Sequence, residues 1–289
     1  MNKAQVENIW GVGATLGEGP VWAGDALWFV DIKQEKVHRC DAQGGDRRSW
    51  DAPEQIGFVL PAEGGGFVAG LRSGLHLFDP ESGGFERIVE VEPDLPGNRL
   101  NDGVVDPAGR LWFGTMDNGE SAPTGSFYSF HRGTLRHSGI SGVPITNGPA
   151  ISPDGRILYW IDTLGRTMHA AEIADDGTLG RSRLLLTLPD GAGNPDGPTV
   201  DSEGCIWISL YAGWAVNRYS PEGALIESVA MPVPNITKIA FGGPDLATAY
   251  ATTANHGMSP EKRAEHPQAG DLFAFAPGAR GLPCPKAQL

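Results

Sequence analysis

Short segments that alternate apolar and polar residues recur along the whole chain. Residues 125–130, 166–173 and 270–275 place apolar side chains at every second position, which is the pattern of a half-buried β-strand. Other segments are apolar and aromatic runs that follow tight turns. The pattern predicts an all-β protein. The one stretch typical of a helix is "SPEKRAEH", a turn or two long, in which Ser259 is placed to cap the helix and Pro260 takes its first position.

These segments belong to a repeat. Four copies share one order of features: an oxygen-bearing residue, a glycine, a short apolar stretch, a turn, and an apolar and aromatic strand. They are "LGEGPVWAGDALWFVDI" from Leu16, "LNDGVVDPAGRLWFGTM" from Leu100, "TNGPAISPDGRILYWID" from Thr146 and "PDGPTVDSEGCIWISLY" from Pro195, and two weaker copies begin at Gln55 and Thr237. The turns "DPAG", "SPDG" and "DSEG" have the residue preferences of type I turns, so each copy reads as a β-hairpin.

The spacing of the repeat predicts a propeller. The equivalent positions are 38 to 49 residues apart and are occupied by Glu18, Ile56, Asn101, Asn147, Asp196 and Thr237. A four-stranded propeller blade takes about 40–50 residues, so six blades account for the chain. No linker or composition shift interrupts it. We therefore expect a six-bladed β-propeller that forms one closed domain over residues 1–289.

The innermost strand of each propeller blade lines a central channel, so residues at the repeat position converge on one axis. Most of the six carry oxygen, and none carries sulfur or imidazole, which is the ligand set of hard divalent cations. Glu18, Asn147 and Asp196 would supply three oxygens and two negative charges and leave coordination positions for water or substrate. The sequence therefore predicts a central metal site of the open, catalytic type.

A purely structural interpretation of these residues is the alternative. Asn and Asp before Gly are common turn residues, but four oxygen-bearing residues at one repeat position favour ligands. In three of the four strong copies the glycine is followed by Pro20, Pro149 or Pro198. These Gly-Pro pairs either hold the ligand in a fixed direction or only mark the entry into a strand.

Composition and charge narrow the classes of partner. The 41 glycines, 23 prolines and 8 tryptophans suit many turns and short aromatic strands. A net charge of −13, with no basic run longer than Arg47-Arg48, argues against nucleic acid. The lack of a long apolar run argues against a secretion signal or a membrane span, so we expect a cytoplasmic protein. Cys40, Cys205 and Cys284 are few, odd in number and widely spaced, which predicts reduced thiols without a metal role.

Other catalytic motifs are absent from the sequence. The seven histidines show no HxH, HxxxH or HExxH spacing, and there is no GxSxG elbow, GxxxxGK phosphate loop or GxGxxG after a strand. The absence of these motifs argues against a serine hydrolase, a nucleotide hydrolase and a dinucleotide-dependent enzyme.

The chain resembles the family of gluconolactonases and senescence marker protein (regucalcin). The resemblance rests on "LGEGPVW", "NRLNDGVVDPAGRLWFGTM", "TNGPAISPDG", "NPDGPTVDSEGCIW" and "FGGPDLATAYATTA", which occur in this order at blade spacing and cover nearly the whole chain. Members of this family are six-bladed propellers that bind a divalent metal and hydrolyse sugar lactones. The resemblance thus implies a metal-dependent lactonase, most similar to the bacterial sugar-acid lactonases.

The resemblance also implies roles for individual residues. The metal ligands of the family fall on Glu18, Asn147 and Asp196, and its substrate contacts fall on Arg99, Asn101 and Glu120. Asp196 is the expected general base, because a carboxylate that binds the metal with one oxygen can hold a water with the other. A role for Asp196 as a ligand only is the alternative, because a bound cation lowers the pKa of a carboxylate.

The expected reaction opens an aldonolactone, such as a xylono-, arabinono- or gluconolactone, to the aldonic acid. One divalent ion is expected: calcium or zinc is favoured, and magnesium, manganese and ferrous iron stay open. The oligomeric state is open between a monomer and a weak homo-oligomer. Two rivals remain. One is a metal-binding propeller without turnover, and the other is a hydrolase of an organophosphate or an acyl-homoserine lactone, which Trp22, Phe58 and Trp214 at the channel mouth would favour.

Overall fold

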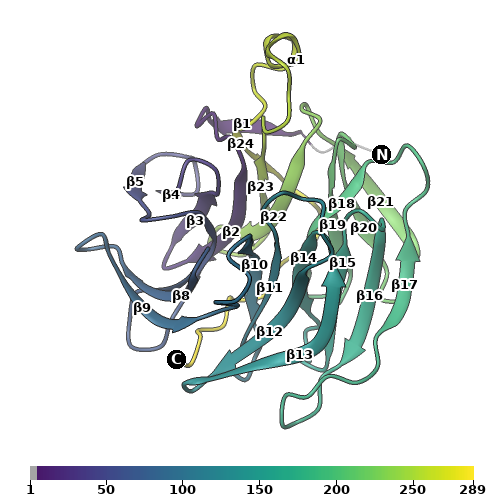
Figure 1. Cartoon of the computed structure of the whole chain (residues 1–289). Helices are drawn as coiled ribbons and strands as arrows, with labels where there is room; N and C mark the ends of the chain where they lie inside the picture. Colours follow the sequence, from purple (N-terminus) through teal and green to yellow (C-terminus); the bar gives the residue numbers. More distant parts are fainter. Residues whose placement is uncertain (1–4) are drawn as a thin grey trace.

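Six four-stranded antiparallel sheets surround a common axis (Figure 1). The computed structural model describes residues 5–289. The innermost strand of each sheet contacts the innermost strands of the two neighbouring sheets, and the last contacts the first. The six-bladed β-propeller that the repeat predicted is therefore confirmed.

The strands follow the chain order from the axis outwards. Blade 1 contains β2 (Gly17–Ala23), β3 (Ala26–Asp31), β4 (Lys36–Cys40) and β5 (Arg48–Asp51). Blade 2 contains β6 (Ile56–Pro61), β7 (Phe67–Leu71), β8 (Gly74–Asp79) and β9 (Gly84–Glu90). Blade 3 contains β10 (Asn98–Val105), β11 (Leu111–Asp117), β12 (Gly125–His131) and β13 (Thr134–Val143). Blade 4 contains β14 (Thr146–Ile151), β15 (Ile157–Asp162), β16 (Thr167–Glu172) and β17 (Arg183–Thr187). Blade 5 contains β18 (Asn194–Val200), β19 (Ile206–Tyr211), β20 (Ala215–Tyr219) and β21 (Leu225–Ala230).

Blade 6 closes the ring with strands from near both ends of the chain. It contains β22 (Ile236–Gly242), β23 (Thr248–Thr253) and β24 (Leu272–Phe275), and its outermost strand is β1 (Glu7–Trp10), which pairs antiparallel with β24. The first strand of the chain thus completes the last sheet. Helix α1 (Pro260–Glu265) lies between β23 and β24, and the Ser259 side chain accepts a hydrogen bond from the Lys262 N–H, as the sequence predicted for the cap.

Each innermost strand is irregular at the repeat position. The register shifts lie between Glu18 and Val21 in β2 and between Asn147 and Ala150 in β14, and the other four innermost strands have a shift at the equivalent place. A register irregularity of this kind bends a strand and changes the direction of a side chain. In four of the blades the affected side chain is an oxygen donor that faces the channel.

The hydrophobic core lies between adjacent blades. The Phe58 ring of β6 is 1 % exposed and lies 6.3 Å from the Phe113 ring of β11 in the next blade. The cysteines predicted to be reduced are free, with Cys40 and Cys205 buried and Cys284 half-buried. Among residues 5–289, no helix is long and apolar enough to cross a membrane.

Candidate active site in the central channel

The six residues that the sequence analysis gave as metal ligands or substrate contacts meet at one end of the channel. A pocket of about 300 Å³, which we call the donor pocket, is lined by Glu18, Arg99, Asn101, Glu120, Asn147 and Asp196, among others. The four that stand at the repeat position are each buried, with at most 7 % of their surface exposed. Their convergence follows from the fold, because residues 18, 101, 147 and 196 begin the innermost strands of four blades.

The remaining two repeat positions play another part. Ile56 is fully buried in the core. The Thr237 hydroxyl donates a hydrogen bond to the Gly17 carbonyl at 2.6 Å and contacts the Thr252 hydroxyl at 2.8 Å. Thr237 therefore ties blade 6 to blade 1.

Each predicted carboxylate ligand uses one oxygen to hold its own backbone. Glu18 Oε2 accepts from the Gly19 N–H at 2.8 Å, and Asp196 Oδ1 accepts from the Gly197 N–H at 3.0 Å. Within the described part of the chain, the second oxygen of each carboxylate receives no hydrogen bond. The two groups are thus fixed in direction and each retains one oxygen for a ligand.

The Asn147 amide is oriented by its neighbours. Its Nδ2 donates to the Thr163 hydroxyl at 2.8 Å, and that hydroxyl donates to the Pro195 carbonyl at 3.0 Å. The Asn147 Oδ1 accepts from Asn101 Nδ2 at 3.2 Å. Because the nitrogen is engaged by Thr163, the oxygen is the atom presented to the pocket.

The electrostatics of the pocket favour a cation. Burial, and then the nearby Asp102 charge, raise the pKa of Glu18 to about 8. Burial, and then the charges of Glu18 and Asp102, raise the pKa of Asp196 well above its ordinary value. Buried carboxylates that repel one another keep their charges only where positive charge compensates them. Two carboxylates and one amide oxygen, without sulfur or imidazole, therefore fit a hard divalent ion.

A buried ion pair that the sequence analysis missed lies beside these carboxylates. Lys238 Nζ donates to both oxygens of Asp102, at 2.6 and 2.8 Å. Asp102 is fully buried and also accepts from the N–H groups of Gly103 at 2.8 Å and Gly148 at 3.1 Å. The pair joins blade 3 to blade 6, which lie on opposite sides of the ring.

The sequence does contain a signal for this pair. In blades 1, 4 and 5 the residue after the oxygen donor is Gly19, Gly148 or Gly197, whereas blades 3 and 6 have Asp102 and Lys238 at that place. Asp102 and Lys238 carry opposite charges and stand where other blades have glycine. The two blades are three apart in the ring, so the charges face each other across the axis. The glycines are needed as well: a Cβ at Gly197 would lie 2.6 Å from the Lys238 side chain.

Arg99 lines the pocket and has one donor without a partner. Its side chain is 2 % exposed, and its NH1 donates to the Leu100 carbonyl at 3.2 Å and to Asn101 Oδ1 at 2.6 Å. The buried Arg99 Nε has no hydrogen-bond partner among the described residues. Burial lowers the pKa of Arg99 to about 10, so the guanidinium stays charged at neutral pH. A buried charged donor without a partner is a position for an oxygen of a ligand.

Glu120 reaches the pocket from the loop after β11. Asp117 holds this loop by accepting from the N–H groups of Gly119, Ser121 and Ala122, at 3.1, 3.1 and 2.9 Å. These hydrogen bonds lower the pKa of Asp117 to about 2. The Glu120 backbone adopts a φ of 59°, so the loop turns its carboxylate towards the channel.

Two basic side chains from other blades, Lys33 and His256, flank Glu120. Lys33 Nζ lies 3.8 Å from Glu120 Oε1, and His256 Nε2 lies 3.6 Å from the same atom. Hydrogen bonding and charge from His256 lower the pKa of Glu120. The backbone of His256 is itself held, because its carbonyl accepts from the Tyr211 hydroxyl at 2.7 Å and its N–H donates to the Thr15 carbonyl at 2.8 Å. Neither Lys33 nor His256 stands in a repeat copy, so the repeat pattern could not identify them.

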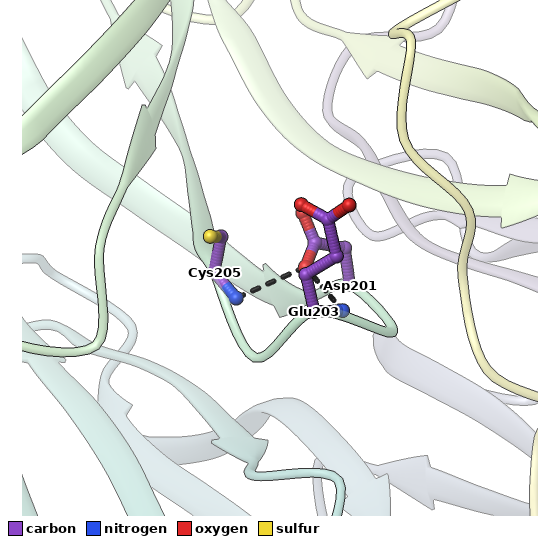
Figure 2. A group of neighbouring side chains, drawn as sticks. All are labelled: Asp201, Glu203 and Cys205. Atoms are coloured by element: carbon purple, nitrogen blue, oxygen red, sulfur yellow. Dashed lines mark hydrogen bonds between the residues drawn. The ribbon is translucent and has the colours of Figure 1, made fainter.

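A second group of acidic atoms lies in the turn between β18 and β19 (Figure 2). Among residues 5–289, Asp201, Glu203 and Cys205 bring one potential ligand atom each within 4.8 Å of one another. The N–H groups of Glu203 and Cys205 donate to Asp201 Oδ1, at 3.0 and 2.9 Å, and Trp207 Nε1 and Arg218 Nε donate to Oδ2, both at 2.9 Å. Arg218 also pairs with Glu203. The guanidinium already compensates the negative charges here.

The equivalent turn of blade 3 has the same arrangement. Asp106 Oδ1 accepts from the Arg110 N–H at 2.9 Å, and its Oδ2 accepts from Trp112 Nε1 at 2.9 Å and from the Arg110 guanidinium at 3.2 Å. Asp106 has no cysteine beside it, yet it makes the same contacts as Asp201. We therefore interpret the Asp201 group as a structural turn that anchors a buried tryptophan.

The apolar residues that would favour another ester lie elsewhere. Trp22 lines a different cavity, and Phe58 is buried between blades. Trp214 is 42 % exposed and packs edge to face on His266, with ring centroids 4.9 Å apart. The expectation that these three side chains surround the channel mouth is thus wrong for Trp22 and Phe58, because the innermost strands carry them away from the donor pocket.

Comparisons with known proteins show the family of the chain. A family model described as the SMP-30/Gluconolactonase/LRE-like region matches residues 16–255. The chain is 37 % identical to an L-arabinolactonase of Azospirillum brasilense, over 90 % of this chain and 87 % of that protein. It is 34 % identical to a 6-deoxy-6-sulfogluconolactonase of Pseudomonas putida, over 90 % and 91 % of the two chains. The structure resembles that of the calcium-binding protein regucalcin from Agrobacterium tumefaciens, with a TM-score of 0.93, 27 % identity and coverage of 99 % and 97 %.

Proposed function

This chain belongs to the SMP-30/gluconolactonase/LRE-like family and is a lactonase, and we propose that it hydrolyses a sugar-derived lactone to the aldonic acid with one divalent metal ion. The observation that carries the proposal is the donor pocket. There, two buried carboxylates each keep one oxygen without a hydrogen bond, and the oriented Asn147 amide and the unpartnered Arg99 Nε lie beside them.

Glu18, Asn147 and Asp196 would hold the metal ion. When bound, a divalent cation polarises the lactone carbonyl as a Lewis acid and compensates the two carboxylates. Calcium is the favoured ion because all three protein ligands are oxygen atoms and a structurally similar protein is described as calcium-binding. Zinc, magnesium, manganese and ferrous iron are the alternatives.

Asp196 is the proposed general base. Its carboxylate would accept the proton of the attacking water as the water oxygen bonds to the carbonyl carbon. The ring C–O bond then breaks, and the same carboxyl returns the proton to the leaving alkoxide oxygen. Two effects act on this base: burial and the neighbouring carboxylates raise the pKa of Asp196, whereas a bound cation would lower it.

Three further residues bind the substrate in this proposal. The Arg99 Nε–H donates to a substrate oxygen, and Glu120 accepts from sugar hydroxyls. Asn101 holds Arg99 and Asn147 in place through its side-chain amide and contacts the ring substituents. The polar lining suits a hydroxylated lactone better than an acyl-homoserine lactone. The activities named for the two similar lactonases point to pentonic and hexonic lactones.

A panel of lactones tests the proposed function. Metal-stripped protein is reloaded with calcium, zinc, magnesium or manganese and assayed on arabinono-, xylono- and gluconolactone with a pH indicator. We expect hydrolysis with at least one ion, and we expect Asp196→Asn to lower kcat by about 10²–10⁴-fold, the usual contribution of a general base.

The exposed turn variant Asp154→Asn is the matched control and should retain turnover within about twofold, as surface substitutions usually do. Wild-type turnover in Asp196→Asn would remove that residue from the mechanism. Tight calcium binding without hydrolysis of any lactone would instead favour a metal-binding propeller without turnover.

A further inference from the structure

A second cavity, of about 480 Å³, lies at the opposite end of the channel from the donor pocket, and we call it the rear cavity. All six innermost strands line the rear cavity, and four of them, β2, β10, β14 and β18, also line the donor pocket. Glu18 begins β2 in the donor pocket, and Pro20 and Trp22 of the same strand line the rear cavity. Likewise Asn147 faces the donor pocket, and Ile151 lines the rear cavity.

The Gly-Pro pairs acquire a role in this arrangement. Pro20, Pro149 and Pro198 all line the rear cavity, each two residues after a proposed metal ligand. Their rings form an apolar wall of the cavity, together with the aliphatic side chains that follow them in each strand. The repeated motif therefore supplies an oxygen to one cavity and an apolar ring to the other.

The polar side chains of the rear cavity are engaged in the protein. Lys238 Nζ is held by Asp102 at 2.6 and 2.8 Å. The Thr199 hydroxyl donates to the Ile239 carbonyl at 2.6 Å, and the Ser152 hydroxyl donates to Asp154 Oδ1 at 2.6 Å. A charged or strongly polar ligand would therefore find few free partners, whereas an apolar ligand would contact a mainly apolar wall.

A segment near the C-terminus crosses the rear cavity (Figure 1, yellow). It is fixed at one end where the Ser202 N–H donates to the Arg280 carbonyl at 2.8 Å, and at the other where the Ala287 N–H donates to the Pro61 carbonyl at 2.8 Å. Between these anchors, residues 282–285 line the cavity, and the described structure gives their backbone N–H groups no hydrogen-bond partner. Two of the four are prolines, which have no N–H. The centre of this segment is therefore held by packing alone.

We propose that the rear cavity binds a small, uncharged and mainly apolar molecule, which enters past residues 282–285. Its volume lies within the range of about 300–1,000 Å³ that small-molecule sites have. An apolar cavity holds water poorly, and an apolar ligand gains contacts that water does not make. The site is separate from the proposed lactonase site, because no residue lines both cavities.

Binding of N-phenyl-1-naphthylamine, an uncharged fluorescent probe, tests this inference. We expect saturable binding of one equivalent to the wild-type protein. Leu282 lines the cavity and is 39 % exposed, so Leu282→Glu places a charge in the apolar wall at a position where it does not disturb the core. The affinity should fall by at least about tenfold, because the bound probe would desolvate the carboxylate.

Leu225→Glu is the matched control, since Leu225 is 58 % exposed on β21 of blade 5 and does not line the cavity. This variant should bind the probe as the wild type does, and so should Glu18→Gln, because Glu18 lines the donor pocket and not the rear cavity. Absence of saturable binding to the wild type, or equal loss in both leucine variants, would overturn the proposal.

A chemical readout locates the bound probe. Cys284 lines the rear cavity and is half-buried, whereas Cys40 is fully buried in blade 1. Saturating probe should slow alkylation of Cys284 by iodoacetamide, followed by mass spectrometry, without changing that of Cys40. An unchanged rate at Cys284 would show that the probe binds elsewhere and would contradict the assignment.

Discussion

Glu18 is a buried residue whose environment opposes its charge. It is 4 % exposed and one of its oxygens accepts a hydrogen bond, yet burial and Asp102 raise its pKa from 4.5 to about 8. A carboxyl whose pKa is raised in the folded state stabilises that state below its unfolded pKa. This stability is lost as the pH rises through the folded pKa. The affected range therefore runs from about pH 4.5 to about pH 8.

We expect Glu18→Gln to remove this loss in metal-free protein. Wild-type protein treated with chelator should lose about 2–5 kcal/mol more unfolding free energy across this pH range than the variant does, because glutamine carries no titrating charge. Urea unfolding at several pH values measures the difference. The exposed variant Glu86→Gln should follow the wild type. Parallel pH profiles of the unfolding free energy for the wild type and Glu18→Gln would contradict a raised pKa of Glu18.

Strands β10 and β22 are tied together through the channel by Asp102 and Lys238. Removing one partner of a buried ion pair leaves an uncompensated charge, which typically costs about 3–5 kcal/mol, whereas removing both often costs much less. We therefore expect Asp102→Asn and Lys238→Met each to lower the unfolding free energy by several kcal/mol. The double variant should be more stable than the sum of the single effects implies.

A double-mutant cycle of urea denaturation measures this coupling. Arg166 and Asp190 provide the control cycle, because Asp190 is almost fully exposed and their surface pair should couple by no more than about 1 kcal/mol. Coupling of the buried pair as weak as that of the surface pair would show that the two charges act independently.

The blade architecture could be predicted from sequence because each element carries its own signal. The turn residues, the apolar strands and the oxygen donor recur in every strong copy, so the number of blades and the convergence of Glu18, Asn147 and Asp196 follow from local pattern. The ion pair could not be predicted from the local pattern. Asp102 and Lys238 are 136 residues apart and differ from the repeat only by standing where other blades have glycine.

The residues that loops and the C-terminal segment contribute could not be predicted from the sequence. Lys33 and His256 approach Glu120 from loops of other blades, where no repeat fixes their position. The rear cavity depends on residues 282–285, whose path across the channel is set by distant backbone hydrogen bonds and not by periodicity. Sequence patterns thus locate residues on regular strands and fail where irregular segments complete a cavity.

A bound cation should stabilise the whole molecule, because the proposed ligands come from three different blades. A ligand at 100 times its Kd stabilises the native state by about 2.7 kcal/mol if it binds only that state. We expect calcium to raise the Tm of metal-stripped protein by several degrees in a calorimetric scan, and we expect Asp196→Asn to lose this shift. Equal Tm values with and without each candidate ion would argue against a metal site that links the blades.

The closure of the ring depends on contacts between the two ends of the chain. Asp271, just before β24, accepts from Asn8 Nδ2 at 2.7 Å and from the Gly13 N–H at 3.1 Å. It therefore fixes β1 in blade 6. Asp271→Ala would remove both hydrogen bonds, and water would bind the donors of Asn8 and Gly13 because both residues are exposed. Strand β1 keeps its backbone pairing with β24, and hydrogen bonds to a charged group contribute about 1.5–3 kcal/mol each. We expect the variant to lose about 2–4 kcal/mol of unfolding free energy, measured by urea denaturation.

The position of Asp271 at the junction makes this loss specific to closure. The exposed turn variant Asp154→Ala removes a carboxylate that accepts hydrogen bonds within one turn and should cost less than about 1 kcal/mol. Hydrogen exchange separates the two cases further, because the amides of β1 and β24 should exchange faster in Asp271→Ala while those of β10 and β14 keep their protection. Uniformly faster exchange over all six blades would show instead that the ring unfolds as one unit and that Asp271 contributes only to its global stability.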